Sequence, residues 1–133
     1  MELVLVVISV NGENGLVLVK IKDIHFIECD KRKKNVLFHT TNESYHFKGT
    51  LSYWIEVLNQ QGFTFKLCDR TAAINMNNIT YLDPVFSRAC FDNDVGPDTK
   101  WCNMSRPKYE AIMEELNLKN RQIQPGYNCM NEA

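Results

Sequence analysis

Residues Phe65 to Asp83 read FKLCDRTAAINMNNITYLD, and this is the most informative stretch of the chain. An apolar strand, predicted over residues 63–68, runs into the polar pair Arg70-Thr71. A run of small residues then ends at Asn75, and a new strand is predicted from Ile79 to Asp83. A tight junction between strands holds polar side chains on a rigid base, from which they reach a ligand.

The residues before this stretch also predict antiparallel strands. The turn sequence NGENG, Asn11 to Gly15, separates two runs rich in Val, Leu and Ile, as is typical of a hairpin. Further apolar runs lie on either side of the basic group Lys31 to Lys34. We therefore expect strands over residues 3–10, 16–22, 24–29, 35–40 and 44–47, and later in the chain over 79–83, 86–91 and 100–104.

Two segments have the spacing of a helix instead. The first is predicted over residues 51–59, because apolar side chains recur at i, i+3, i+4 and i+7: Leu51, Trp54, Ile55 and Leu58. Thr50 is suited to cap its start and Gly62 to end it. The second helix begins near Pro107, which fits a first helical turn, and its apolar stripe consists of Tyr109, Ile112, Met113 and Leu116.

These patterns predict a mainly β fold with an antiparallel sheet and two short helices. No second helix follows the segment 51–59 after a short turn, which excludes a helix-turn-helix motif. We expect one domain over residues 1–116. The polar residues 117–133 are expected to form a flexible C-terminal tail.

Charge and cysteine content restrict the class of protein. The chain of 133 residues has a net charge of −1, so it has the size of one domain without the basic total of most nucleic-acid binders. Five cysteines without a CxxC pair or zinc-ligand spacing predict a reduced, cytoplasmic protein with mostly buried thiols, Cys68 among them, and no metal site. The apolar stretch 1–10 lacks the features of a signal sequence or a membrane segment.

Sequence motifs of enzymes are missing. The chain contains no GxGxxG, P-loop, GxSxG or HExxH pattern. No local arrangement of Ser, His and acidic residues would activate a nucleophile. We therefore expect no enzyme activity, no catalytic residue, no cofactor and no small-molecule substrate.

Two basic groups are candidates for contacts with an anionic partner. Lys31-Arg32-Lys33-Lys34 is the densest run of positive charge and lies at a predicted hairpin tip. Binding of such clustered charges to phosphates is favourable because it releases counterions from the nucleic acid. The alternative for such a run is a solvated tip without a partner. Lys100, Arg106 and Lys108 form the second group. Positive charge early in a helix opposes the helix dipole, which favours a ligand role over a stabilising one.

The order of these elements resembles the LytTR family of DNA-binding domains, which commonly form the output end of bacterial response regulators. The resemblance spans about Leu16 to Leu116 and rests on an ordered set of residues: Asp23-Ile24, Phe26-Ile27-Glu28, Gly49-Thr50-Leu51, Arg70, Asn75, Ile79 and Ser105-Arg106. It implies an elongated antiparallel β-sheet domain that inserts loops into successive major grooves of double-stranded DNA. Self-association on direct repeats and bending of the DNA are also implied.

The resemblance implies roles for individual residues. Arg70 matches a residue that reaches the major groove in the family, where a guanidinium pairs with guanine O6 and N7. Asp69 stands where many members have histidine. Its carboxylate would repel phosphate, accept a hydrogen bond from a base such as cytosine, or orient Arg70. Asn75 either contacts a base or fixes a turn. The expected DNA contacts are Lys31, Arg32, Lys33, Lys34, Asp69, Arg70, Thr71, Asn75, Lys100, Arg106 and Lys108.

Two functions follow from these observations. The first is sequence-specific DNA binding by a stand-alone bacterial transcription regulator, because no receiver domain precedes the first predicted strand. The second is a protein-interaction module on the same fold that antagonises a regulator of this family. Asp69 and the acidic total favour the second function, whereas the two basic groups favour the first.

Overall fold

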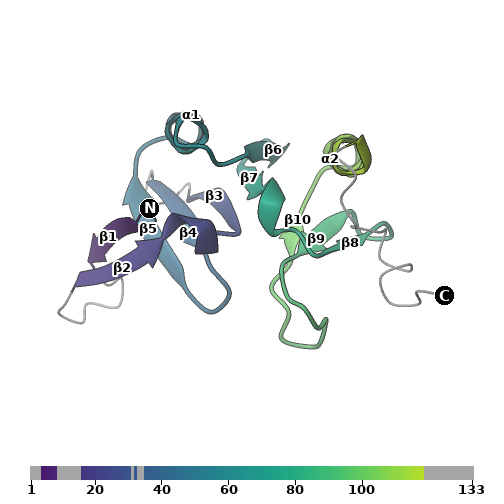
Figure 1. Ribbon diagram of the computed structural model, residues 1–133, viewed down its shortest axis with the longest axis horizontal. Helices are drawn as coiled ribbons and strands as arrows, with labels where there is room; N and C mark the ends of the chain where they lie inside the picture. The colour runs from purple at the N-terminus through teal and green to yellow at the C-terminus, as the bar shows by residue number, and fades with distance from the viewer. Residues whose placement is uncertain (1–3, 9–15, 31, 33–34, 119–133) are drawn as a thin grey trace.

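The computed structural model describes residues 4–8, 16–30, 32 and 35–118 and shows an elongated molecule (Figure 1). Ten strands and two helices follow one another in these ranges, joined in two places by short 3₁₀ turns, η1 (Ile21–Asp23) and η2 (Met76–Asn78). The elements are β1 (Val4–Ile8), β2 (Leu16–Lys20), β3 (Phe26–Asp30), β4 (Asn35–His39), β5 (Ser44–Lys48), α1 (Leu51–Gln60), β6 (Phe65–Asp69), β7 (Ala72–Asn75), β8 (Tyr81–Asp83), β9 (Arg88–Cys90), β10 (Cys102–Asn103) and α2 (Arg106–Leu118).

The strands form three antiparallel sheets. The largest has the order β5-β4-β3-β7-β6, so β3 and β7 pair at its centre although they are far apart in the sequence. A second sheet has the order β10-β9-β8, and β1 pairs only with β2. Figure 1 shows β1–β5 in one half of the molecule, β8–β10 in the other, and β6 and β7 between them. The predicted mainly β fold with two helices is confirmed.

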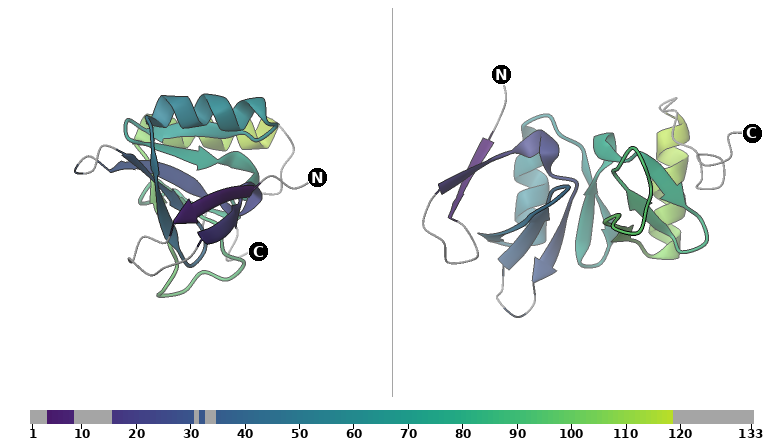
Figure 2. Two further views of the ribbon diagram at one scale, coloured as in Figure 1. Left: turned by 90° about the vertical axis from the view of Figure 1, so that its left-hand side faces the viewer. Right: turned by 90° about the horizontal axis from the view of Figure 1, so that it is seen from below.

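The two helices lie on the same side of the molecule, α1 over the first half and α2 over the second (Figures 1 and 2). The Thr50 side chain accepts a hydrogen bond from the Tyr53 amide at 3.1 Å, which confirms the predicted cap of α1. Gly62 has a φ of +98°, which glycine adopts without strain and which ends the helix. Neither helix has the length and apolar character that crossing a membrane requires, within the ranges described above.

The paired strands β3 and β7 separate two hydrophobic cores. Phe26 and Ile74 pair across the strands and face the core that β8–β10 and α2 complete. Their neighbours Ile27 and Ala73 also pair, but face the core that α1 covers. Side chains alternate between the faces of a strand, so this one pair of strands supplies both cores. The structure therefore depends on the β3–β7 register.

The sequence-based prediction missed β7. Residues 72–75 are Ala-Ala-Ile-Asn, a short segment with only one residue that favours strands, and it looks like part of a junction. All four side chains are buried because the strand lies inside the sheet and is covered on both faces. Small residues suit such a position, since they let the covering elements approach closely. Packing thus overrides the weak local preference.

Other boundaries differ by a few residues. The strand predicted over 86–91 is only Arg88–Cys90, because a turn occupies residues 84–87, and that predicted over 100–104 is only Cys102–Asn103. The helix α2 continues to Leu118, two residues into the predicted tail. The NGENG turn, most of the basic run at 31–34 and residues 119–133 lie outside the described residues.

We predict that Ala73→Leu destabilises the protein. Ala73 is fully buried between Ile27 and Leu67 on the neighbouring strands and lies beneath α1, so a larger side chain forces the helix away from the sheet. The expected loss is about 1–3 kcal/mol of unfolding free energy, measured by urea denaturation. The control Ala111→Leu, on the exposed face of α2, should change stability by less than about 0.5 kcal/mol. Equal effects of the two substitutions would show that the β7 position is not tightly packed.

Candidate nucleic-acid interface

The two-residue turn Arg70-Thr71 joins β6 to β7 at one end of the five-stranded sheet. The Cys29 amide donates a hydrogen bond of 2.8 Å to the Thr71 carbonyl oxygen, which fixes the turn against the end of β3. Residues 31–34 follow β3 directly, since Asp30 and Asn35 form the last pair of β3 and β4. The structure therefore brings Arg32 and the β6–β7 turn to the same end of the sheet.

The start of α2 reaches this end as well. The Ser105 amide donates a hydrogen bond of 3.1 Å to the Cys68 carbonyl oxygen, so the residue before the helix lies beside the end of β6. In the right-hand view of Figure 2, the ends of β3 and β4, the β6–β7 turn and the start of α2 follow one another along the lower edge of the molecule. We call this the turn edge, and among the residues that the structure describes its basic members are Arg32, Lys48, Arg70, Arg106 and Lys108.

Lys48 was not among the predicted contacts. It pairs with Asn35, at the end of β4 that borders the basic run, and its side chain is exposed. The sequence could have indicated this contact, because Lys48 directly follows the strand predicted over residues 44–47. That strand must return antiparallel to β4. Pairing places that end beside the tip between β3 and β4.

Arg70 is exposed at the middle of the turn edge. Its backbone amide donates a hydrogen bond of 2.9 Å to the Asp69 carboxylate, which holds the turn while the guanidinium extends into solvent. Of the other predicted contacts, Arg32 and Lys108 are also exposed, and Thr71 is half-buried. Lys31, Lys33 and Lys34 lie outside the described residues.

Arg106 is only partly available to a ligand. Its guanidinium donates hydrogen bonds to the Pro84 carbonyl oxygen at 2.5 Å, to Ser87 Oγ at 3.1 Å and to the Glu110 carboxylate at 3.2 Å. These bonds attach the β8–β9 turn to the start of α2. About half of the side chain remains exposed, at 52%, so Arg106 presents positive charge at the turn edge while it stabilises the turn.

Lys100 lies away from the turn edge. Its ammonium group donates hydrogen bonds to the Thr40 and Glu43 carbonyl oxygens, at 2.9 and 3.1 Å, and lies 3.5 Å from Ser44 Oγ. Thr40 and Glu43 belong to the β4–β5 turn and Ser44 begins β5, at the opposite end of β4 from the turn edge. Burial lowers the pKa of Lys100, against the smaller opposing effect of the Glu43 carboxylate. The structure thus separates Lys100 from Arg106 and Lys108, with which the sequence groups it.

Asn75 points into the protein. It is 1% exposed, its amide nitrogen donates a hydrogen bond of 3.0 Å to the Ile24 carbonyl oxygen, and its Oδ1 atom accepts from the Asn77 amide. Of the two roles considered for this residue, fixing a turn agrees with this geometry. A base contact would require both bonds to break, so we leave Asn75 out of the interface.

Cys68 is fully buried, with its Sγ atom 3.5 Å from that of Cys102 on β10. The hydrogen bond with Cys68 and burial both raise the pKa of the Cys102 thiol well above its ordinary value. The pair therefore forms part of the core behind the β6–β7 turn, as predicted for an inward strand cysteine.

Comparison with known proteins identifies the family and the fold. The sequence model of one protein family, described as the LytTr DNA-binding domain, matches residues 14–117. The fold is similar to a solved LytTr DNA-binding domain from a Bacillus cereus protein described as a methyl-accepting/DNA response regulator. The TM-score is 0.61, with 17% sequence identity over 86% of this chain and 95% of that one, a likeness that concerns the fold alone. A search of curated proteins found no match.

We predict that Asn75→Ala lowers stability rather than acting at the surface. The substitution removes the shorter of two side-chain hydrogen bonds to the buried Ile24 carbonyl oxygen, the other being that of Asn78 at 3.4 Å. The expected cost is about 0.5–1.5 kcal/mol in denaturant unfolding. Asn93→Ala, in an exposed loop, serves as the control and should be neutral. An Asn75→Ala protein of unchanged stability that has lost affinity for DNA would contradict the structural role.

Proposed function

Because the chain belongs to the family of LytTR DNA-binding domains, we propose that it recognises specific sequences in double-stranded DNA as a bacterial transcription regulator. One observation supports the proposal above all others. The ends of β3 and β4, the β6–β7 turn and the start of α2 share the turn edge, and each carries an exposed basic residue: Arg32, Arg70 and Lys108. DNA is a regular array of phosphates, which such a row of charges fits.

The middle of the turn edge is suited to the major groove. The β6–β7 turn has only two residues, and the groove, about 12 Å wide, admits a two-stranded ribbon. The guanidinium of Arg70 then meets the base edges from a turn whose backbone is fixed by Asp69 and Cys29. A bidentate contact with guanine O6 and N7 is the interaction that this side chain makes best. We assign sequence readout to Arg70.

The flanks of the turn edge are suited to phosphates. Arg32 and Lys48 lie to one side of Arg70, and Arg106 and Lys108 lie to the other. Phosphate contacts fix the register of a protein on DNA but carry no sequence information. We propose phosphate contacts for these four residues and for the lysines of the run 31–34. The loops that carry them would then enter successive major grooves.

The antagonist function rests on the net charge of −1 and on the carboxylate of Asp69. Asp69 pairs with Ala72, which faces the core of β8–β10, so its side chain is directed to the inner face of the sheet and not along the turn edge. Its effect on approaching phosphates is thereby reduced. DNA binding remains the better proposal.

The proposal is tested by selection from a pool of random duplexes, followed by titration of the enriched site. We expect specific binding that weakens steeply with salt. Arg32→Ala should reduce the slope of log affinity against log salt concentration by about one, which corresponds to one lost phosphate contact. Titration of DNA that carries tandem copies of the site also tests self-association, because proteins that associate on direct repeats bind them cooperatively. Failure to bind any duplex at low salt above the level of an acidic control protein would favour the antagonist function.

We predict that Arg70→Lys relaxes sequence specificity. Lysine keeps the charge but loses the bidentate geometry, so binding to the selected site should weaken by about 1–3 kcal/mol and binding to unrelated DNA much less. The matched control is Arg32→Lys, which should preserve affinity because a phosphate accepts either side chain. Equal weakening on all duplexes by Arg70→Lys would make Arg70 a phosphate contact and place the readout elsewhere.

A further inference from the structure

A cleft of about 450 Å³ lies between the five-stranded sheet and the segment that leads into β10. Its wall on the sheet includes Phe26, Glu28, His39 and Ser44, and its opposite wall is formed by residues 100–103. Asp69, the last residue of β6, and the turn residue Thr71 close one end. This volume is in the range of small-molecule sites, and the cleft is separate from the turn edge proposed to contact DNA.

The sheet side of the cleft carries an ordered chain of polar groups. The Nε2 atom of His39 lies 2.7 Å from the Glu28 carboxylate, and its Nδ1 atom lies 2.8 Å from Ser44 Oγ. His39 also stacks on Phe26, with ring centroids 4.3 Å apart. The hydrogen bond with His39 lowers the pKa of Glu28, against the opposing effect of burial, so this carboxylate is ionised at neutral pH. The groups are fixed in place before any ligand arrives.

A β-bulge directs a second carboxylate into the cleft. The β6–β7 register shifts between Leu67 and Asp69, so that Asp69, and not Cys68, pairs with Ala72. Ala72 pairs on its other side with Glu28. Glu28, Ala72 and Asp69 therefore lie side by side on three neighbouring strands and share one face. The small side chain of Ala72 leaves room for a cationic group between the two carboxylates, and bulges commonly direct a side chain into a site in this way.

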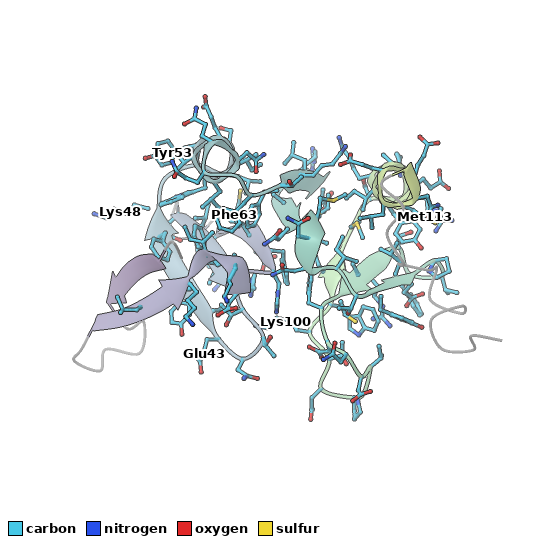
Figure 3. The ribbon with its side chains drawn as sticks, viewed as in Figure 1. Glu43, Lys48, Tyr53, Phe63, Lys100 and Met113 are labelled. Atoms are coloured by element: carbon cyan, nitrogen blue, oxygen red, sulfur yellow. The ribbon has the colours of Figure 1, made fainter. Side chains whose placement is uncertain are left out.

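The opposite wall supplies a positive charge and an aromatic surface. Within the described residues, the hydrogen-bond acceptors of the Lys100 ammonium group are neutral oxygens, so these contacts do not neutralise its charge. Figure 3 shows Lys100 between the two halves of the molecule, close to the turn that contains Glu43. Trp101 lies next to it along the chain and is held by Tyr81 and by the Arg88 guanidinium, 3.9 Å from the Trp101 ring centroid. A ligand with an anionic group is thus favoured at this wall.

We propose that the cleft binds a small zwitterion of the amino-acid class, with its ammonium group between Glu28 and Asp69 and its carboxylate facing the ammonium group of Lys100. Phe26 and Trp101 provide the apolar surface for the side chain of the ligand. The site is also coupled to the turn edge, because the Asp69 carboxylate accepts a hydrogen bond from the backbone amide of Arg70. A ligand that engages the Asp69 carboxylate changes how firmly the β6–β7 turn is held, and with it the affinity for DNA.

The first experiment measures thermal unfolding with each standard amino acid in turn, at millimolar concentration and without DNA. At least one should raise Tm, because a ligand bound only by the folded state stabilises it. Its amide, which lacks the carboxylate, and its N-acetyl form, which lacks the ammonium group, should both fail to do so. If no amino acid raises Tm, or if the two derivatives act as well as the parent compound, the proposal is overturned.

Variants locate the site. Asp69→Asn should weaken binding of the active amino acid about tenfold or more in calorimetry, because it removes a charged acceptor. Ala72→Leu should block binding by filling the floor of the cleft without a change of charge, and its folding is checked by circular dichroism. Glu56→Gln, an exposed carboxylate on α1, is the matched control and should bind as the wild type does. Equal affinity of all these proteins would overturn the assignment to the cleft.

The second experiment measures affinity for the selected DNA site with and without the amino acid. Only this link to DNA rests on the proposed function. The amino acid should change DNA affinity of the wild type and leave that of Asp69→Asn unchanged. A chain that binds the amino acid but no DNA overturns the proposed function and supports the cleft. If the chain binds DNA but no amino acid changes its Tm, the proposed function is supported and the proposed amino-acid site is overturned.

Discussion

The backbone pairing of β3 with β7 links both hydrophobic cores to the β6–β7 turn. Its three pairs, Phe26–Ile74, Ile27–Ala73 and Glu28–Ala72, alternate between two cores and a polar cleft. A register shift of one residue would move every one of these side chains to the wrong face. The hydrogen bond from Cys29 to Thr71 continues the ladder as far as the β6–β7 turn. Core packing and the position of Arg70 are therefore fixed by the same backbone pairing.

The bulge in β6 gives consecutive residues different tasks. Cys68 is buried in the core, Asp69 lines the cleft on the same face, and Arg70 extends from the turn into solvent. A regular strand would direct Cys68 and Asp69 to opposite faces. The extra residue lets the core and the cleft share one face of the sheet. It also explains how a carboxylate stands next to a proposed DNA-binding arginine without pointing along the same edge.

The sequence predicted most of the local structure and little of the cleft. Thr50, Gly62 and the helical spacing from Leu51 to Leu58 act within a few residues, so α1 was predicted well. The strand β7 was missed because its burial comes from elements far away in the chain. Lys100 was grouped with Arg106 by sequence distance, yet it bonds to the β4–β5 turn about 60 residues earlier. Neither the register nor a bulge has a local signal in these residues.

The charge distribution, rather than the net charge, decides whether this chain suits DNA. The acidic loop with Asp92, Asp94 and Asp98 precedes Lys100, which is attached to the β4–β5 turn. That turn and the turn edge lie at opposite ends of β4, a strand of five residues and thus about 16 Å long. Physiological salt screens exposed charges over about 8 Å. In the proposed binding mode, phosphates at the turn edge meet its basic residues with little repulsion from the acidic loop, so a net charge of −1 is compatible with DNA binding.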